Sequence, residues 1–288
     1  MSRRARSDSG ATGCVLVDKP AGCTSHDVVD DVRRALGTRK VGHAGTLDPD
    51  ATGVLVLGVG AGTKLLQFVT GAAKTYTGRA RFGIETSTLD ASGEVTATHE
   101  MSLDPTAVTA AARGFLGDIE QIPPMVSAVK VDGKRLHELA REGKEIAREP
   151  RPVTITRFDL EPTDDPLAYD FVVDCSSGTY IRTLVADLGA ALGGGAHLQQ
   201  LRRSAVGPFT LDDCCRLDDL VLRPLVDLVR GMAVIDVDDV VASQVRNGRP
   251  LGPAPGSGRL VVRGPGEEVL AVYETRDGEL KPVKVLAP

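Results

Sequence analysis

The chain has 288 residues with a mass of 30.3 kDa, and 42% of them are hydrophobic. This is enough for one large domain, or for a large and a small one, around an apolar core. No apolar run reaches the roughly 18 residues of a membrane helix, and residues 1–13 lack the apolar stretch of a signal peptide. Five cysteines without a C-x-x-C pair indicate neither a zinc site nor a disulfide framework. We therefore expect a cytoplasmic protein with reduced thiols and no membrane contact.

The net charge of −5 disfavours a general affinity for nucleic acid, because phosphate contacts need Lys and Arg. This negative charge is local, however: residues 212–239 carry eight aspartates and three arginines, which accounts for the whole excess. The remainder is balanced and has basic runs at 33–40 and 130–151. The second run also contains four glutamates, so its spacing fits a solvated helix face as well as an RNA contact.

The first predicted elements are a tail, a strand and a helix. Residues 1–12 are polar and basic and should be disordered. An apolar strand at 14–17 leads to Asp18-Lys19-Pro20. Ser25 is the predicted N-cap of a helix that Gly37 ends, since apolar residues recur between them at helical spacing.

Residues 42–53, G-H-A-G-T-L-D-P-D-A-T-G, predict a sharp turn before a buried strand at 54–57. Asp48 lies at this turn. Asp before Pro is a common turn starter, so a capping role is one interpretation. The other is a reactive carboxylate, because a loop supported by a buried strand can present a side chain to a cleft.

The same stretch fits a second pattern. Residues 48–52 match D-x-D-x-T, the nucleophile loop of the haloacid-dehalogenase-like phosphatases. That loop works with Mg²⁺ and directly follows a buried apolar strand. The residues before Asp48 include two glycines and predict no such strand, so the sequence favours this interpretation less.

The middle of the chain begins with a short helix at 63–69 and a strand at 74–82, whose alternation puts Tyr76 on the inner face. A buried tyrosine either packs in the core or offers its ring to a ligand. A turn-rich segment, Asp90-Ala91-Ser92-Gly93, follows. Asp104 and Pro105 then open a helix that runs to Leu116.

The second half contains the string Q-I-P-P-M-V-S-A-V-K at 121–130, a tight turn at Asp132-Gly133 and a short basic helix at 135–141. Strands at 152–160 and 168–175 lead into a further helix, near whose start Arg182 lies. The chain closes with short β-like runs after residue 259. Asp277-Gly278 predicts a hairpin between the last two of these runs.

Six stretches, in this order, resemble motifs of the TruB-type tRNA pseudouridine synthases. They are Lys19-Pro20-Ala21-Gly22, the loop 42–53, Lys74-Thr75-Tyr76, 121–130, 176–184 and 193–203. The resemblance covers nearly all of residues 13–210. Thr46 and Asp50 stand where the family varies, and Val126 stands where an aromatic residue is common.

The resemblance implies an α+β protein with the pseudouridine synthase fold, in which helices flank a central, mostly antiparallel mixed sheet. Residues 13–230 would form the catalytic domain, after a disordered basic tail at 1–12. An insertion at about 124–151 would contact RNA. Residues 231–288 would form a small, β-rich, PUA-like RNA-binding domain.

The function implied by the resemblance is isomerisation of uridine-55 in the T-loop of tRNA to pseudouridine, on a flipped-out nucleotide. No cofactor or metal is needed, because the reaction adds no atoms and changes no oxidation state. The T-arm of tRNA is the implied partner, no protein partner is required, and a monomer suffices. The implied roles are Asp48 as nucleophile, Tyr76 and Leu201 on either side of the base, Tyr180 enclosing it, Arg182 pairing with Asp48, and His43 and Lys19 contacting substrate.

Several alternatives remain open from the residues. Asp48 can attack either C1′ of the ribose or C6 of uracil, and the Tyr76 hydroxyl is a candidate acceptor of the C5 proton. An Mg²⁺-dependent phosphatase using Asp48 and Asp50 would lose its activity in EDTA. An RNA-binding module without catalysis would be indifferent to Asp48→Asn. A glycoside hydrolase is weaker still, since no second carboxylate is evidently paired with Asp48.

Overall fold

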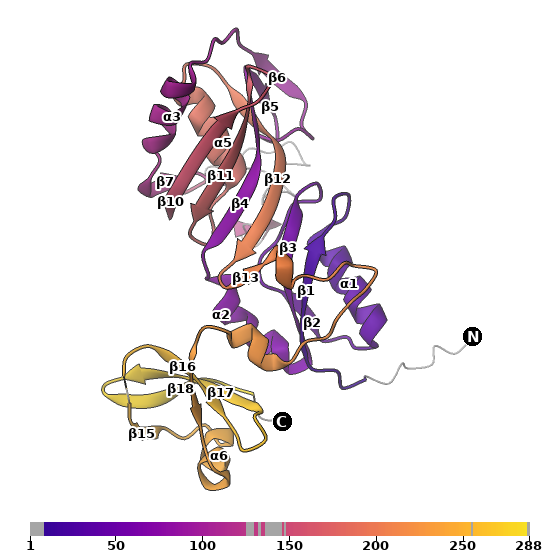
Figure 1. Cartoon of the computed structure of the whole chain (residues 1–288), viewed down its shortest axis with the longest axis vertical. Helices are drawn as coiled ribbons and strands as arrows, with labels where there is room; N and C mark the ends of the chain where they lie inside the picture. The colour runs from indigo at the N-terminus through magenta and orange to yellow at the C-terminus, as the bar shows by residue number, and fades with distance from the viewer. Residues whose placement is uncertain are drawn as a thin grey trace, which may run out of the picture. The chain divides into compact units, whose positions relative to one another are not determined.

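The computed structural model describes residues 9–124, 130–131, 134–135, 146, 148–254 and 256–286. The chain divides into two compact units, each of which is considered by itself (Figure 1). The terminal unit comprises residues 1–49, 53–71 and 207–288, and the central unit comprises residues 50–52 and 72–206. Val126, the turn at 132–133 and residues 136–141 of the predicted basic helix lie outside the described residues, and Arg135, its predicted first residue, belongs to a short strand instead.

The N-terminal part of the terminal unit is a small antiparallel sheet covered by one helix. Strands β1 (Gly13–Lys19) and β2 (Val41–His43) both pair with β3 (Thr52–Val59), and α1 (Ser25–Leu36) supplies the helix. Valines and leucines from all four elements form one buried cluster. Its members are Val15, Val17, Val28, Val29, Val32, Val41, Leu55, Leu57 and Val59. Burial of this apolar face fixes α1 against the sheet.

The start of α1 differs by one residue from the sequence prediction. Thr24, not Ser25, is the N-cap: its hydroxyl accepts from the Asp27 backbone N–H at 3.1 Å, and the Asp27 carboxylate accepts in return from the Thr24 N–H at 2.8 Å. This is a capping box. Gly37 ends the helix in a left-handed conformation, as predicted.

The predicted disordered tail is too long at its C-terminal end. Ser9 donates two hydrogen bonds to the end of α1, from its N–H to the Gly37 carbonyl at 3.1 Å and from its hydroxyl to the Leu36 carbonyl at 2.7 Å. The Thr12 hydroxyl accepts from the Ala61 N–H at 2.8 Å. Ser9 is therefore held by carbonyls at the end of α1, and Thr12 by an N–H of the turn at residues 60–64.

After β3 the chain makes two short helical turns where the sequence predicts one helix at 63–69. These are the 3₁₀ helix η1 (Gly60–Lys64) and α2 (Leu66–Thr70). Gly58 and Gly62 explain the tight start, because a Cβ on Gly58 would lie 2.6 Å from the Gly62 carbonyl carbon. Close backbone approach at this corner requires glycine.

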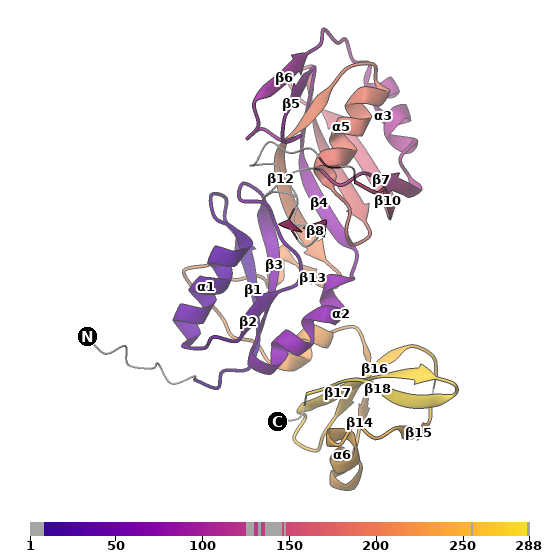
Figure 2. The ribbon, with the colours of Figure 1, turned by 180° about the vertical axis from the view of Figure 1, so that it is seen from behind.

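The central unit is built on an antiparallel sheet with two helices on one face (Figures 1 and 2). The strand order is β12-β4-β11-β10-β7, and each neighbouring pair is antiparallel. The strands are β12 (Ala196–Val206), β4 (Lys74–Phe82), β11 (Ala168–Cys175), β10 (Arg151–Pro162) and β7 (Gly117–Gln121), and the helices are α3 (Pro105–Arg113) and α5 (Ile181–Ala191).

Strand β4 alternates as predicted. Lys74, Tyr76, Ala80 and Phe82 are buried, while the intervening Thr and Arg side chains are not. Arg79 on the outer face donates two hydrogen bonds to Asp170 of β11, at 2.6 and 2.9 Å. One face of this strand is therefore buried, and the other is polar or charged and partly exposed.

Two short hairpins complete the central unit. Strand β5 (Ile84–Thr86) pairs with β6 (Val95–Thr98). Strand β8 (Lys130–Val131) pairs with β9 (Lys134–Arg135). The predicted helix from Asp104 begins as expected, with Asp104 as N-cap and Pro105 at the first position, but it ends at Arg113.

The C-terminal part of the terminal unit is a five-stranded sheet with one helix. Its strand order is β14-β16-β17-β18-β15, and Tyr273 at its centre is fully buried. The elements are η2 (Leu211–Asp213), η3 (Leu225–Val229), β14 (Ala233–Asp236), α6 (Asp239–Arg246), β15 (Leu251–Pro253), β16 (Arg259–Arg263), β17 (Val269–Arg276) and β18 (Glu279–Val285). Asp277 and Gly278 both have positive φ, which confirms the predicted hairpin turn.

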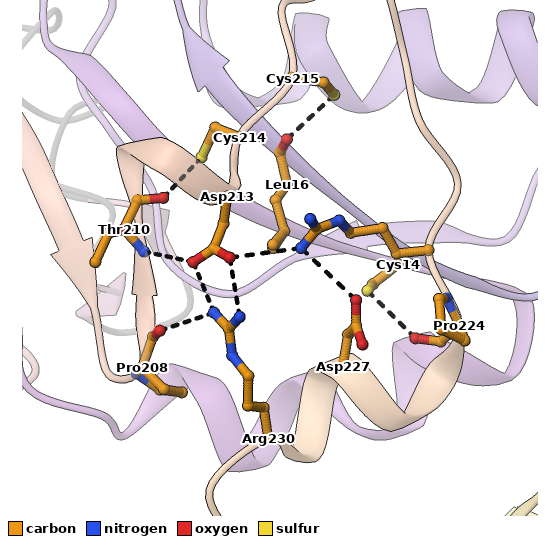
Figure 3. Close-up of polar contacts among 11 residues, drawn as sticks. Cys14, Leu16, Pro208, Thr210, Asp213, Cys214, Cys215, Pro224, Asp227 and Arg230 are labelled. Carbon is orange, nitrogen blue, oxygen red and sulfur yellow. Dashed lines mark hydrogen bonds and ion pairs between the residues drawn. The ribbon is translucent and has the colours of Figure 1, made fainter. Parts of the chain in front are cut away.

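The acidic segment before this sheet lies along the edge of β1. The backbones of Cys14 and Arg223 exchange two hydrogen bonds, at 2.9 and 2.8 Å, and the Cys215 N–H donates to the Leu16 carbonyl at 2.8 Å. Figure 3 shows Asp213 at the centre of the side-chain contacts. Its carboxylate accepts from Arg230 at 2.6 and 2.9 Å and lies 3.7 Å from Arg223. The segment thus covers an edge strand and neutralises part of its own charge.

All five cysteines are free thiols, as the sequence predicts. Burial raises the pKa of Cys14 and Cys214 to about 12 and that of Cys175 to about 11. Cys14 and Cys215 donate to backbone carbonyls of Pro224 and Leu16 (Figure 3). These three raised values keep the thiols protonated at neutral pH, which makes them poor nucleophiles.

The Asp213 contacts give a pH-dependent contribution to stability. The hydrogen bonds from Arg230 lower the pKa of Asp213 to about 2, so the stabilisation is complete above the unfolded value near 4 and is lost as the pH falls toward 2. We expect the free energy of unfolding of the wild type to decrease by about 1 kcal/mol more than that of Asp213→Asn between pH 6 and pH 3. Urea unfolding at successive pH values measures this difference, and parallel pH curves for the two proteins would contradict it.

Candidate active site

Asp48 lies on the loop between β2 and β3 in the terminal unit. Ala44, Leu47 and Ala51 of this loop are each at most 4% exposed, whereas Asp48 is half-buried. The Ala44 N–H donates to the Val56 carbonyl at 2.9 Å. Buried apolar residues thus anchor an irregular loop and leave the carboxylate at its surface.

The phosphatase interpretation requires a buried strand directly before Asp48. Strand β2 has three residues and ends at His43, and residues 44–47 between it and Asp48 are irregular. The loop therefore does not have the strand-to-nucleophile junction that the D-x-D-x-T pattern needs.

Both neighbours of Asp48 are held by hydrogen bonds to their backbones. The Leu47 N–H donates to the Ser25 hydroxyl at 2.8 Å, and this hydroxyl donates to the Leu47 carbonyl at 3.1 Å. On the other side, the Pro49 carbonyl accepts from the Lys19 ammonium and from the Gly22 N–H, each at 3.0 Å. The backbone on either side of Asp48 is therefore fixed.

Lys19 is fully buried, and its ammonium also donates to the carbonyls of Pro20 at 2.8 Å and Cys23 at 2.7 Å. Three carbonyls match the three donors of a lysine ammonium. We interpret Lys19 as a residue that holds the loop. Its predicted contact with substrate stays a prediction. His43 ends β2 opposite Leu57 and is half-buried, in the same unit as Asp48.

In the central unit the sheet register brings two predicted residues together. Tyr76 on β4 lies opposite Arg203 of β12, and Gly78 lies opposite Leu201. Tyr76 and Leu201 are therefore diagonal neighbours on one face of the sheet, a separation that an aromatic and a leucine side chain can span. Tyr76 is 7% exposed and Leu201 is half-buried.

Gly78 lies between these two residues, and its lack of a side chain is required. A Cβ there would lie 2.3 Å from the Gln200 carbonyl oxygen and 2.5 Å from Cζ of Phe171. The backbone of β4 thus approaches its neighbours more closely than any other residue type permits.

Arg182 is the second residue of α5 and is 6% exposed. Its guanidinium donates to the Thr88 carbonyl and to the Asp90 carboxylate, each at 3.2 Å. Asp90 in turn accepts from the hydroxyls of Thr88 at 2.6 Å and Ser92 at 2.5 Å. The loop after β5 therefore orients a buried cation.

The sequence interpretation missed Asp90, which it assigned only to a turn. A signal was available, because an arginine predicted at a water-poor site needs a carboxylate partner. In the sequence analysis, Asp48 is the one carboxylate partner of Arg182. Nothing local in the sequence indicates that the turn at 90–93 lies beside the start of α5.

Tyr180 is the N-cap of α5 but supplies no side-chain cap. Instead, the side chain of Gln121, which ends β7 and is 1% exposed, forms hydrogen bonds with the backbone of Tyr180. The Tyr180 N–H donates to the Gln121 side-chain oxygen at 2.9 Å, and the Gln121 amide donates to the Tyr180 carbonyl at 3.3 Å. This reciprocal pair fixes the start of the helix that carries Arg182.

The seven predicted site residues fall in two groups. Lys19, His43 and Asp48 belong to the terminal unit, and Tyr76, Tyr180, Arg182 and Leu201 belong to the central unit. Within the second group, Tyr76 and Leu201 are neighbours. The predicted pairing of Asp48 with Arg182 joins the two units and stays a prediction.

A hollow of about 750 Å³ lies in the central unit, beside the outer face of the sheet. Arg79, Asp170 and Arg202 line it, and Gly78 and Leu201 border it as well. Arg79 and Asp170 neutralise each other. Tyr76 is not one of its lining residues, whereas its diagonal neighbour Leu201 is.

No group of three or more His, Cys, Asp or Glu side chains among the described residues is arranged to hold a metal ion. Separately, none of the helices in the described part of the chain is long and apolar enough to cross a membrane.

Gln121 provides a test of how the start of α5 is held. Replacement by Ala removes the partner of the Tyr180 N–H and one of two donors to the Tyr180 carbonyl, which keeps the Leu184 N–H at 3.0 Å. Because the N–H is left without that partner, we expect Gln121→Ala to lower the free energy of unfolding by about 1–3 kcal/mol. Urea unfolding measures this change. The matched control is Gln199→Ala on β12, which is exposed and should change stability by less than about 0.5 kcal/mol. Equal effects of the two substitutions would contradict the assigned role.

Three family models match the chain in succession. Residues 33–181 match the N-terminal domain of the TruB family pseudouridylate synthases. Residues 182–225 match a tRNA pseudouridylate synthase B C-terminal domain, and residues 232–287 match the C-terminal domain of tRNA pseudouridine synthase II. The first match alone spans more than half of the chain.

Curated relatives match over almost their full length. The chain is 46% identical over 287 residues to tRNA pseudouridine synthase B of Mycobacteroides abscessus, covering 96% of each chain. It is 44% identical over 301 residues to the protein of that name from Mycobacterium ulcerans, covering 100% of this chain and 99% of the relative.

Solved structures share the fold. A Cbf5-Nop10-Gar1 complex contains a chain that is 25% identical, with a TM-score of 0.74 over 96% of this chain and 85% of that chain. An H/ACA RNP bound to a substrate RNA containing 2′-deoxyuridine contains a chain that is 22% identical, with a TM-score of 0.72. The predicted α+β fold with a small C-terminal β domain is confirmed. From these matches and the motifs above, the chain belongs to the TruB family of pseudouridylate synthases.

Proposed function

We propose that this protein converts a uridine of tRNA into pseudouridine. The observation that carries the proposal is the likeness, along 96% of the chain at 46% identity, to relatives named tRNA pseudouridine synthase B. Because the substrate is tRNA, we also propose that the protein acts in the cytoplasm. As the finer assignment we propose uridine-55 in the T-loop, with the T-arm as the part of tRNA that is recognised and a monomer as the working form.

The reaction breaks the C–N glycosidic bond of uridine and rejoins ribose C1′ to uracil C5. The atoms of substrate and product are the same, so no external oxidant, reductant or group donor enters the balance. The protein must supply a nucleophile, a water-poor chamber in which the freed uracil turns, and an acceptor for the C5 proton. We assign these tasks to side chains of this chain.

Asp48 is the proposed nucleophile. A carboxylate can attack C1′ with departure of the uracil anion, or it can add to C6 of the ring; both routes begin with a bond from an Asp48 oxygen and end with its release. The fixed backbone on either side of Asp48 supports this role, since covalent catalysis requires the attacking atom to be held close to its target.

Tyr76 and Leu201 are the proposed walls around the uracil. Their diagonal placement on one face of the sheet supports this assignment, because an aromatic ring offers a stacking surface to a base and a leucine side chain offers an apolar one. We assign Tyr180 to the same chamber and the Tyr76 hydroxyl as acceptor of the C5 proton. His43 would brace the nucleotide, whose extrusion costs a few kcal/mol.

Arg182 is proposed to keep Asp48 ionised and oriented. A guanidinium at bidentate distance favours the charged form of a carboxylate in a water-poor site. The hydrogen bond from Arg182 to Asp90 supports this proposal, because it fixes the guanidinium before substrate binds. Asp90 is therefore a positioning residue for Arg182.

The catalytic and the C-terminal parts of the chain have different proposed tasks. We assign catalysis to residues 13–230 and RNA binding to the β-rich residues 231–288, with a further RNA contact from the insertion at about 124–151. No protein partner is included in this proposal.

The central test uses an unmodified T-arm stem-loop in buffer containing EDTA. We expect wild type and Asp50→Asn to form pseudouridine, because Asp50 is exposed and no metal is required, and Asp48→Asn to lose at least ~10³-fold in rate. Tritium release from C5-labelled uridine measures the rate. Equal rates for wild type and Asp48→Asn, or loss of activity in EDTA, would refute the proposal.

A further inference from the structure

We infer that the Ser25 hydroxyl is a positioning residue for the reacting carboxylate, acting through the backbone of Leu47. The inference rests on the proposed function only in taking Asp48 as the nucleophile. Ser25 would not touch substrate. It would set the rate of the chemical step by fixing the residue that precedes Asp48.

The contact between Ser25 and Leu47 is short, doubled and buried. The hydroxyl accepts from the Leu47 N–H at 2.8 Å and donates to the Leu47 carbonyl at 3.1 Å. Ser25 is 2% exposed and Leu47 is 4% exposed, so water does not compete for these groups. One hydroxyl therefore satisfies both backbone groups of an irregular, buried loop residue.

The support behind Ser25 is rigid. It is the first residue of α1, and Val28, Val29 and Val32 bury this helix in the core of the terminal unit. A side chain with a single rotatable torsion on a packed helix transmits the position of that helix to the loop. The loop itself has no regular secondary structure that would do so.

Neighbouring hydroxyls at the start of α1 have separate tasks. Thr24 caps the helix through Asp27, and Ser25 makes no cap contact. Loss of the Thr24 hydroxyl therefore weakens the helix start and leaves the loop contact in place. Loss of the Ser25 hydroxyl removes the loop contact and leaves the helix cap in place. The chain thus contains its own control, one residue away.

The far side of Asp48 remains anchored when Ser25 is changed. Lys19 and Gly22 still hold the Pro49 carbonyl, so the loop would not detach. It would pivot about Pro49, which moves the Asp48 carboxylate while leaving the RNA-binding surface unchanged. A displacement near 1 Å reduces the rate of a positioned reaction by about 10²-fold.

The experiment compares wild type, Thr24→Ala, Ser25→Ala and Ser25→Cys in the full-length protein. Cysteine nearly retains the volume of serine but is a weak hydrogen-bond donor and acceptor. The readouts are the single-turnover rate of pseudouridine formation at a saturating concentration of protein over a T-arm stem-loop, the Kd of the protein for the same RNA, and the Tm of each protein.

We expect both Ser25 variants to react about 10- to 100-fold more slowly than wild type, with Kd changed by less than about twofold. Thr24→Ala should lower Tm by a few degrees and keep a rate within about twofold of wild type. This split between rate and affinity separates positioning from binding, and the Thr24 control separates it from stability.

Three results would overturn the inference. They are an unchanged rate in Ser25→Ala, a wild-type rate in Ser25→Cys, which would show that volume alone matters, and an equal loss of rate in Thr24→Ala. Failure of the wild type itself to form pseudouridine is a different result. It would refute the proposed function, and with it the role of Asp48.

Discussion

Hydrogen bonds from buried side chains to the backbones of irregular segments are the constraint on which the candidate site depends. The side chains that we propose as catalytic lie on a loop and at a helix start, where the backbone has no regular partners. Lys19 and Ser25 supply partners around Asp48, and Gln121 does so at Tyr180. Each is almost fully buried and therefore belongs to the core as much as to the site. The fold and the site cannot be varied independently at these positions.

In both units, charged side chains are paired with partners of opposite charge. In the central unit one buried cation, Arg182, has a carboxylate partner that is itself held by two hydroxyls. In the terminal unit the acidic segment that accounts for the net charge is partly neutralised by Arg223 and Arg230, against the edge of β1. Negative charge is thus placed where it closes a sheet edge, and a chain with an acidic total can still present local cationic surfaces to RNA.

Much of the fold was predictable because its signals are local. The alternation on β4 placed Tyr76 correctly, and Asp277-Gly278 identified the last hairpin. The N-cap of α1 was misplaced by one residue because Thr24 and Ser25 are both good caps. Asp27, three residues after Thr24, completes the capping box and is the local signal that distinguishes them. Elements β14 and α6 were missed since they are short and lie within or beside the acidic segment. Asp90 and Gln121 were missed because their partners are 92 and 59 residues away.

Gly78 limits how this protein can change. Its neighbours on the sheet are Tyr76 and Leu201, the two proposed walls around the base, and there is no room for even one methyl group between the strand and the Phe171 ring. Divergence of specificity within such a scaffold must therefore proceed through the walls and the loops. Position 78 itself accepts no side chain, so a change of specificity at this site would have to leave Gly78 in place.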